Sequence, residues 1–294
     1  MCIFDNQKLR IMNPKYYLPI IALIATLTTA AQHINWHNES TDTVSINKTL
    51  KRAVMISDSE KRVASIAREF IGRPYVAGTL ENDSEEKLTI NLDEVDCTTL
   101  IDYVTAFALT AGEHRTSWRD FAYNLERLRY RGGEMKDYAS RLHYISDWIV
   151  DNTHRGNLEE ATGRCDLATY EIKTIDFMSA NRKLYPALAD SATYARIKQT
   201  EIGYRSHRFP IIKTSRVAKA AKTFLRTGDI IALCTGKKGL DVSHMGILFI
   251  DEKNVPYLLH ASSKAGKVIL DTTPLDRYLT QNRLTGIRVI RLKE

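Results

Sequence analysis

Glycine and proline are scarce in this sequence, with 14 and 7 residues among 294. That scarcity excludes a collagen-like chain or a long flexible tract. Hydrophobic residues make up 44% and charged residues 26%, which is close to an ordinary globular protein and excludes a largely disordered one. A single long apolar run, at residues 17–31, excludes a multi-span membrane protein. The length allows one large or two small domains.

The apolar run has the features of a leader segment. Three basic residues precede it and small residues follow it, an order that predicts a signal peptide over residues 1–31 with cleavage near Ala31. The run is shorter than the about 20 residues that a membrane span needs, so a retained anchor is the weaker alternative. We therefore expect an exported protein, periplasmic or secreted, with no stable membrane insertion after cleavage.

Charge gives little indication of a nucleic-acid partner. Residues 1–31 contribute +2 of the formal net charge of +7, which leaves about +5 for the mature chain. No basic run with interleaved aromatic residues is present, so we expect no nucleic-acid binding.

Cysteines are few, and they limit both metal binding and cross-linking. Cys2 lies in the predicted leader, which leaves Cys97, Cys165 and Cys234. None of them has the ligand spacing of a structural zinc site, so we expect no metal. Three cysteines cannot all pair within one chain, so at least one is free or pairs with another chain. A Cys165–Cys234 disulfide and two separate buried thiols both remain open.

The order of helical and strand patterns predicts an α+β fold. Residues 32–56 are polar and are expected to form a linker, and residues 57–294 a single domain. Helical periodicity marks residues 57–71, 96–111 and 116–130, and short apolar runs after Gly228 predict consecutive strands. Helices followed by a block of strands indicate an antiparallel sheet packed against helices.

Cys97 is the strongest candidate for a catalytic residue. Asp96 is a good N-cap, which places Cys97 in the first turn of a nearly all-apolar helix. A helix N-terminus stabilises a thiolate, and its free N–H groups can bind an oxyanion. The charge of Asp96 opposes the thiolate, and a cysteine opening an apolar helix is more often a small core residue. A nucleophile would therefore need a histidine partner.

Two histidines supply that partner. His244 starts one predicted strand and His260 ends the next, so a hairpin would bring the two rings side by side. One ring could then accept the thiol proton while the other orients it. Either histidine by itself would be interpreted as a polar residue at the end of a strand. The pair lies about 147 residues after Cys97, a separation in the range of papain-like enzymes.

These motifs carry a family resemblance. DC at a helix start, HMGI on a strand and HASS on the next are similar to the NlpC-type cysteine peptidases of bacterial cell walls. GRPYVAGTLE resembles the segment in which a tyrosine of that family lines the site. EVDCTTLIDYVTAFAL, YASRLHYISDW and GDIIALCTGKKGLDVSHMGILF look like the N-acetylmuramoyl-L-alanine amidase-like branch, formerly a domain of unknown function. The resemblance covers most of residues 57–294.

The resemblance implies a papain-like fold and a mechanism. Cys97 would be the nucleophile, His244 the general base and His260 the orienting residue, with Tyr75 beside the thiol. The N–H of Cys97, at the turn that Asp96 caps, would help to form the oxyanion hole. The reaction would need no metal or organic cofactor. It would cleave the amide bond between N-acetylmuramic acid and L-alanine in peptidoglycan or a muropeptide.

Two departures from the family bear on substrate size. Many relatives have DCSGF where this chain has DCTTL, so Thr98 and Thr99 replace small residues. The region around 112–225, expected to be a mostly helical insertion, is longer than a minimal relative requires. We expect this insertion to wall the cleft and to favour small muropeptides over intact wall.

Weaker candidates could contact substrate. The sequence places Ser140 and Arg141 in an aromatic segment, where the guanidinium could grip a peptide carboxylate or simply be exposed. Asp241 and Ser243 precede His244 and could bind an amine or hydroxyl, or only shape a turn.

Two other functions remain open. One is an endopeptidase of the same fold that cuts between D-glutamate and the diamino acid. The other is a non-catalytic wall-binding protein. For each of these functions we expect the protein to be a monomer.

Overall fold

The computed structural model of the protein describes residues 34–81 and 85–293. The predicted signal peptide lies outside this range. Within it, no helix is both long enough and apolar enough to cross a bilayer.

An antiparallel sheet with strands of different lengths forms the centre of the domain. Its strands follow the order β4-β5-β10-β6-β7-β8-β9, and β3 also pairs with β10. Every pairing within it is antiparallel, which confirms the predicted α+β class. The strands are β3 (Leu158–Glu160), β4 (Thr169–Lys173), β5 (His207–Lys213), β6 (Ile230–Thr235), β7 (Val242–Ile250), β8 (Pro256–Ser262), β9 (Lys267–Leu270) and β10 (Leu284–Leu292).

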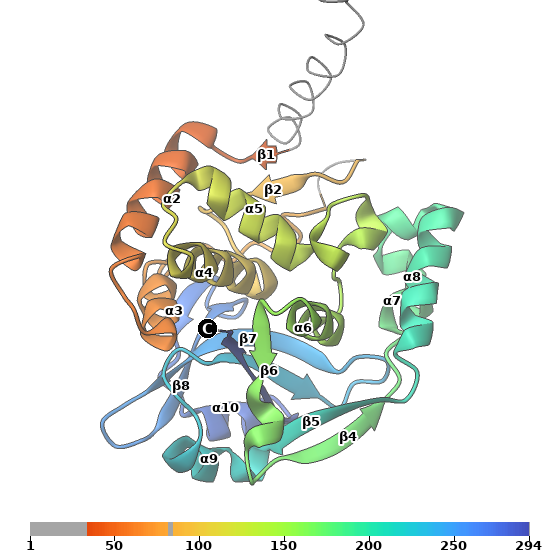
Figure 1. The fold of residues 1–294 in the computed structure, drawn as a ribbon. Coiled ribbons are helices and arrows are strands. Elements are labelled where there is room, and N and C mark those ends of the chain that lie inside the picture. The colour runs from red at the N-terminus through yellow and green to blue at the C-terminus, as the bar shows by residue number, and fades with distance from the viewer. Residues whose placement is uncertain (1–33, 82–84, 294) are drawn as a thin grey trace, which may run out of the picture. The chain divides into compact units, whose positions relative to one another are not determined.

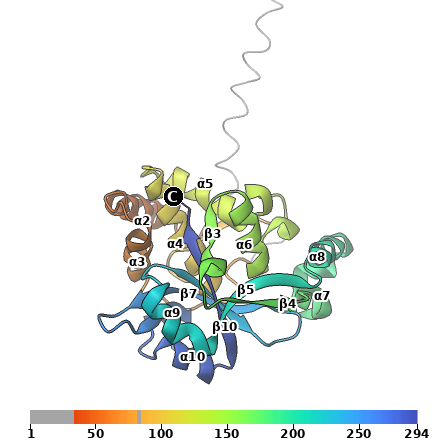
Figure 2. The same ribbon diagram turned by 60° about the horizontal axis from the view of Figure 1, so that its bottom comes forward.

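Helices cover both faces of this sheet (Figures 1 and 2). One face carries α2 (Glu39–Ala53), α3 (Ser59–Arg68), α4 (Cys97–Gly112), α5 (Trp118–Arg129) and α6 (Ile145–His154), with α3 and α4 against β7. The other face carries α9 (Val217–Thr223) and α10 (Leu275–Gln281), whose apolar residues share a core with β6 and β10. Burial of both faces explains why β6 reads as a continuous apolar run rather than an alternating one.

The remaining elements are small or lie near the β4 edge. A two-stranded sheet joins β1 (Ile34–Trp36) to β2 (Leu88–Ile90). Beside β4 and β5 lie α7 (Phe177–Ala180) and α8 (Ser191–Gly203) (Figure 1). Single 3₁₀ turns connect several elements, and one of them, η5, spans Tyr138–Ser140.

The expected linker at 32–56 contains a helix instead. Residues 39–53 form α2, which Asn38 caps through its side chain. Ile46, Leu50 and Ala53 are spaced 4 and 3 residues apart and are buried, so one face of the helix packs inward. The polar residues between them hide this pattern in the sequence. The next helix starts at Ser59 with Asp58 as its cap, two residues later than the expected start at Ser57.

Helical elements predominate in the region 112–225, but the region also contributes strands to the main sheet. It supplies β3, β4 and β5, and two of these strands pair directly with β10. In β4 exposed and half-buried residues alternate, and no apolar run marks it in the sequence. The region therefore extends the main sheet as well as adding helices.

Candidate functional site

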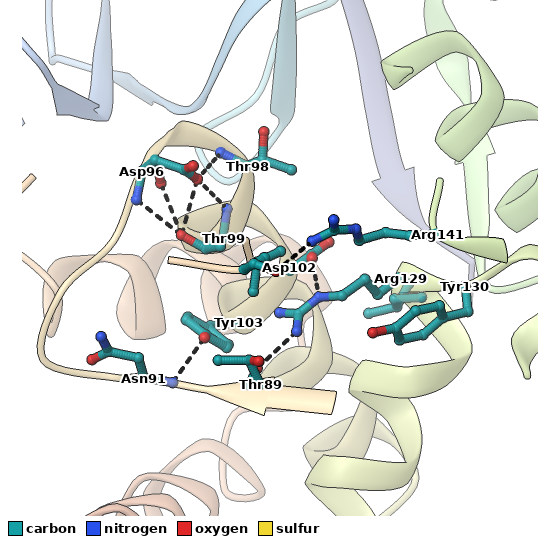
Figure 3. Close-up of polar contacts among 12 residues, drawn as sticks. Thr89, Asn91, Asp96, Thr98, Thr99, Asp102, Tyr103, Arg129, Tyr130 and Arg141 are labelled. Carbon is teal, nitrogen blue, oxygen red and sulfur yellow. Dashed lines mark hydrogen bonds and ion pairs between the residues drawn. The ribbon is translucent and has the colours of Figure 1, made fainter. Parts of the chain in front are cut away.

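The N-terminus of α4 presents Cys97, as the sequence predicts. The Asp96 carboxylate accepts hydrogen bonds from the N–H groups of Thr98 (3.0 Å) and Thr99 (2.8 Å). The Asp96 N–H donates in return to the Thr99 hydroxyl at 2.9 Å, which completes a capping box (Figure 3). These reciprocal bonds fix the helix start, so Cys97 is the first helical residue.

The Cys97 thiol is half-buried and protonated at neutral pH. Burial raises its pKa to about 11, and the neighbouring charge of Asp96 adds to the increase. A backbone hydrogen bond from Met245 and the Thr98 hydroxyl, 4.0 Å from Sγ, act in the opposite direction. Met245 directly follows His244, so β7 runs beside the thiol.

His244 and His260 lie side by side, which confirms the expected juxtaposition. His244 Nε2 and His260 Nδ1 are 2.7 Å apart, and the two rings are nearly perpendicular. Burial lowers the pKa of His244 to about 3, with a further decrease from His260. Both the thiol and this imidazole are therefore uncharged at neutral pH. In the part of the chain that the structure describes, no hydrogen bond joins Cys97 Sγ to His244.

Tyr75 lies near the thiol, as expected. Its segment runs beside the residue before the cap, with a backbone bridge between Tyr75 and Val95. Burial raises the pKa of the Tyr75 hydroxyl, and Cys97 and Asp96 add to the increase. The phenol is therefore a neutral hydrogen-bond donor beside Cys97.

Two residues near the histidines are not marked by the sequence. Asp271 Oδ2 lies 3.5 Å from His260 Nε2, and the Tyr278 ring meets the His260 ring edge-on at 5.4 Å. Asp271 directly follows β9, but an aspartate after a strand is usually turn chemistry. Tyr278 lies on a short helix whose apolar residues point to the core.

A pocket opens beside Cys97 on the side of α5 and α6. Asp96 and Thr98 line its near end, and Arg129, Arg141 and Trp148 line it further on. Leu80, Leu142 and Gly78 add apolar surface. The pocket thus combines guanidinium and indole groups with an apolar wall, a combination that suits a polar ligand with apolar parts.

A buried ion pair forms the floor of this pocket. Arg129 Nε donates to Asp102 Oδ2 at 2.8 Å, and Arg129 Nη1 donates to the Thr89 carbonyl at 2.8 Å (Figure 3). Burial raises the pKa of Asp102, while the charge of Arg129 opposes the increase. No local pattern predicts this pair, because its members are 27 residues apart on different helices.

The four weaker candidates divide into two kinds. Arg141 lines the pocket but is buried rather than exposed, and it pairs with Glu81 at 2.6 Å and Glu86 at 3.5 Å. Ser243 is exposed on β7 next to His244. The Ser243 side chain is open to solvent, whereas Arg141 Nη1 and Nη2 already donate to the Leu80 carbonyl and to Glu81. Contact of either residue with a ligand stays a prediction.

Ser140 and Asp241 form polar contacts within the protein. The Ser140 hydroxyl donates to the Asp137 carbonyl at 2.6 Å and accepts from the Lys136 N–H at 3.0 Å. Asp241 is fully buried, accepts a hydrogen bond from Ser146 and lies 3.6 Å from Arg288. The Ser140 hydroxyl is thus bonded inside the protein, whereas Asp241 Oδ1 is buried without a hydrogen-bond partner among the described residues. Contact of either residue with substrate stays a prediction.

Metal ligands and disulfides play no visible part here. Across residues 34–81 and 85–293, no group of three or more His, Cys, Asp or Glu side chains is placed to hold a metal ion. Cys165 and Cys234 are separate buried thiols.

Cys97, at the N-terminus of α4, lies beside Met245 of β7, the residue that follows the first histidine of the hydrogen-bonded pair. The chain also matches the model of the AmiA-like family, described as N-acetylmuramoyl-L-alanine amidase-like, over residues 65–287. It therefore belongs to that family. No curated protein matches it significantly.

Solved structures agree with this membership. The chain is 40% identical to an N-acetylmuramoyl-L-alanine amidase from Bacteroides uniformis, with a TM-score of 0.75 over 79% of this chain and 99% of that one. A Bacteroides fragilis protein provisionally assigned as a xylanase is 41% identical, with a TM-score of 0.73 over 78% and 100%. A Legionella pneumophila protein at 22% identity shares the fold, with a TM-score of 0.66 over 87% and 96%.

Proposed function

We propose that this protein is an N-acetylmuramoyl-L-alanine amidase that cleaves the bond between N-acetylmuramic acid and L-alanine in peptidoglycan or its fragments. The observation that carries the proposal is the position of Cys97 at the start of α4, beside the strand that holds His244. Family membership and the name of the Bacteroides uniformis relative support the substrate class. We propose further that the fold is papain-like and of the NlpC type, and that the protein acts after export.

In the first step of the proposed reaction, the proton of Cys97 passes to His244 as the sulfur attacks the substrate. The Sγ atom attacks the lactyl carbonyl carbon, and the carbonyl electron pair moves to oxygen. The N–H groups at the start of α4, including that of Cys97, would stabilise this oxyanion. His244 then gives the proton to the leaving amine of L-alanine, and a thioester remains. Water, deprotonated by His244, releases the carboxylic acid and restores the thiol.

Neutral resting groups fit this order of events. A pKa of about 11 for Cys97 and about 3 for His244 places the proton on sulfur before substrate binds. Proton transfer would therefore accompany attack rather than precede it. Bound substrate that excludes water would also strengthen the charge interactions of the developing imidazolium.

The pocket beside Cys97 would hold the part of the substrate next to the scissile bond. Arg141 and Trp148 offer a guanidinium and an indole to carboxylate, hydroxyl or sugar-ring groups. The segments between 112 and 225 supply Arg129, Arg141 and Trp148 to this wall. We propose that this wall favours small muropeptides over intact polymer.

A glycosidase, as the Bacteroides fragilis name suggests, is a poorer fit. Glycoside hydrolysis uses two carboxyl groups that act on the bond as acid and as nucleophile or base. Three carboxylates line the pocket, but capping bonds hold Asp96, Arg129 holds Asp102 and Arg141 holds Glu81.

The test uses the purified protein with defined disaccharide-tetrapeptides and mass spectrometry of the products. We expect free disaccharide and free tetrapeptide, and no turnover by Cys97→Ala. Cys165→Ala is the matched control, because Cys165 is a buried thiol in the cluster that contains α9 and α10. A disaccharide that keeps a shortened peptide would indicate the endopeptidase. Binding without any cleavage, unchanged in Cys97→Ala, would indicate a wall-binding protein.

A further inference from the structure

The second nitrogen of His260 lies near the carboxylate of Asp271. His260 is buried, and its Nδ1 faces His244 Nε2 at 2.7 Å. Its Nε2 is also buried and makes no hydrogen bond within the described residues, while the Asp271 carboxylate lies 3.5 Å from it, at ion-pair distance. Asp271 thus extends the line of groups that starts at Cys97.

Local structure fixes the Asp271 carboxylate. Asp271 directly follows β9, and its N–H donates to the Leu258 carbonyl of β8 at 2.8 Å, so it is tied to the strand that carries His260. Its Oδ1 accepts the Thr273 N–H at 2.7 Å. That bond occupies one oxygen and leaves the other, Oδ2, directed at His260.

This geometry determines which nitrogens carry protons. An ionised carboxylate can only accept a hydrogen bond, so the proton of a neutral His260 belongs on Nε2. His260 Nδ1 is then an acceptor, and His244 Nε2 must donate to it. His244 consequently has its lone pair on Nδ1, the nitrogen left free to accept a proton from the thiol.

We propose that Asp271 is a positioning residue that selects the reactive tautomer of His244 by acting through His260. This inference rests on the proposed cysteine mechanism for its catalytic meaning, but the tautomers are a property of the protein itself. Asp271 does not take a proton in the cycle. When His244 becomes an imidazolium, its hydrogen bond to His260 and the Asp271 carboxylate beside His260 Nε2 already favour the positive charge.

The charged and titratable groups around this line come from four elements. His244 lies on β7, Cys97 on α4 and Tyr278 on α10, while His260 itself lies on β8. The pKa of the Tyr278 phenol is raised by burial and by Asp271, so it is neutral and supplies no competing charge. Within residues 34–81 and 85–293, Asp271 is therefore the anion found at ion-pair distance from the His260 ring.

Asp271→Asn is an informative change because Thr273 anchors one oxygen. The Asn carbonyl would keep the bond to the Thr273 N–H, and the amide NH₂ would then face His260 Nε2. A donor at that place moves the His260 proton to Nδ1 and the His244 proton to Nδ1 in turn. Asp251→Asn is the matched control: Asp251 also accepts backbone N–H groups in a turn, those of Lys253 and Val255, but at the β7–β8 hairpin.

The first experiment records the histidine ¹⁵N NMR spectrum of the full protein at neutral pH. We expect both His244 and His260 to carry the proton on Nε2 in the wild type and in Asp251→Asn, and on Nδ1 in Asp271→Asn. A wild-type His260 protonated on Nδ1 overturns the proposal, and so does an Asp271→Asn protein with unchanged tautomers. The wild-type spectrum decides the matter even if the variant does not fold.

The second experiment measures kinetics with the muropeptide substrate. By analogy with other second-layer partners of functional histidines, Asp271→Asn should lower kcat by about 10- to 100-fold with little change in KM. An unchanged kcat in a protein with shifted tautomers would overturn the positioning role. Absence of amidase activity in the wild type, with the expected tautomers present, would instead contradict the proposed function.

Discussion

Arg129 of α5 and Asp102 of α4 form a buried ion pair, with only about 3% of either side chain exposed. Asp102 lies one helical turn after Thr98, the residue that follows Cys97. The pair joins the helix that presents the thiol to the helix that walls the pocket. A buried charge that loses its partner lowers the stability of the fold, so neither side chain can be replaced alone without a penalty. The ion pair therefore fixes α4 and α5 relative to each other.

Breaking this pair should therefore be costly to stability. Asp102→Asn should lower the free energy of unfolding by about 3–5 kcal/mol, because the Arg129 charge stays buried without its counter-ion. The double change Asp102→Leu and Arg129→Met should recover much of that loss. Urea denaturation measures both. Glu69→Gln, which breaks the more exposed Arg52–Glu69 pair, is the control and should cost less than about 1 kcal/mol. A loss that small for Asp102→Asn would contradict the argument.

Alkylation of Cys97 should show the neutral resting state of the site. Because its pKa is about 11, the rate with iodoacetamide should keep rising from pH 6 to pH 10, beyond the range in which a free thiol near 8.5 levels off. Peptide mass spectrometry identifies the modified thiol, with glutathione as the reference. A plateau reached below pH 7 would indicate a resting thiolate–imidazolium pair and reverse our order of proton transfer.

Acid should destabilise the fold before the carboxylates titrate. Burial lowers the pKa of His143 to about 3, with a further decrease from Arg141, and its Nε2 bonds the Tyr138 carbonyl at 2.8 Å. A histidine pKa below the ordinary 6.5 means that the unfolded chain binds the proton more readily. This contribution is fully present above about pH 6.5 and is lost as the pH falls toward 3.

Ordinary carboxyl groups titrate near pH 4, so between pH 6.5 and 5 the slope reports the buried histidines with lowered pKa, and the difference between the wild type and His143→Gln gives the share of His143. The free energy of unfolding should decrease over that range, and less steeply in His143→Gln. His154→Gln changes an exposed histidine and should leave the slope as it is. Equal slopes in all three proteins would rule out His143 as a source.

Gly246, two residues after His244, should not tolerate a side chain. An added Cβ would lie 2.7 Å from the Leu258 side chain and from the Leu259 carbonyl of β8. Gly246→Ala should therefore cost about 1–3 kcal/mol in thermal or urea unfolding and disturb the His244–His260 contact. Gly203→Ala, at the end of α8 with nothing within 4 Å, should be close to neutral. A fully stable Gly246→Ala would show that β7 and β8 can separate locally.

The sequence predicted those parts of the fold whose local signals agree with their surroundings. Asp96 is a strong N-cap in front of an apolar helix, and both the cap and α4 are present. The strands after Gly228 are buried on both faces, so their apolar runs are visible without a structure. The same runs placed His244 and His260 on neighbouring strands.

The parts that were missed depend on distant contacts. Residues 39–53 carry three well-spaced apolar residues among many polar ones, and α2 gains its stability from packing rather than from its own pattern. Arg129 and Asp271 bear no local mark, since each acquires its partner only when elements far apart in the chain meet. The sequence does not show whether Ser140 and Asp241 contact substrate or other protein groups, because a polar side chain near a candidate site can equally satisfy buried backbone and arginine groups.

The place of β10 in the sheet has a consequence for biosynthesis. This strand, the last one in chain order, lies between β5 and β6, which have no direct pairing with each other. A nascent chain on the ribosome therefore cannot close its sheet until residues 284–292 have emerged. Until then the facing edges of β5 and β6 expose unpaired backbone groups beside apolar side chains, a state prone to aggregation that chaperones would recognise.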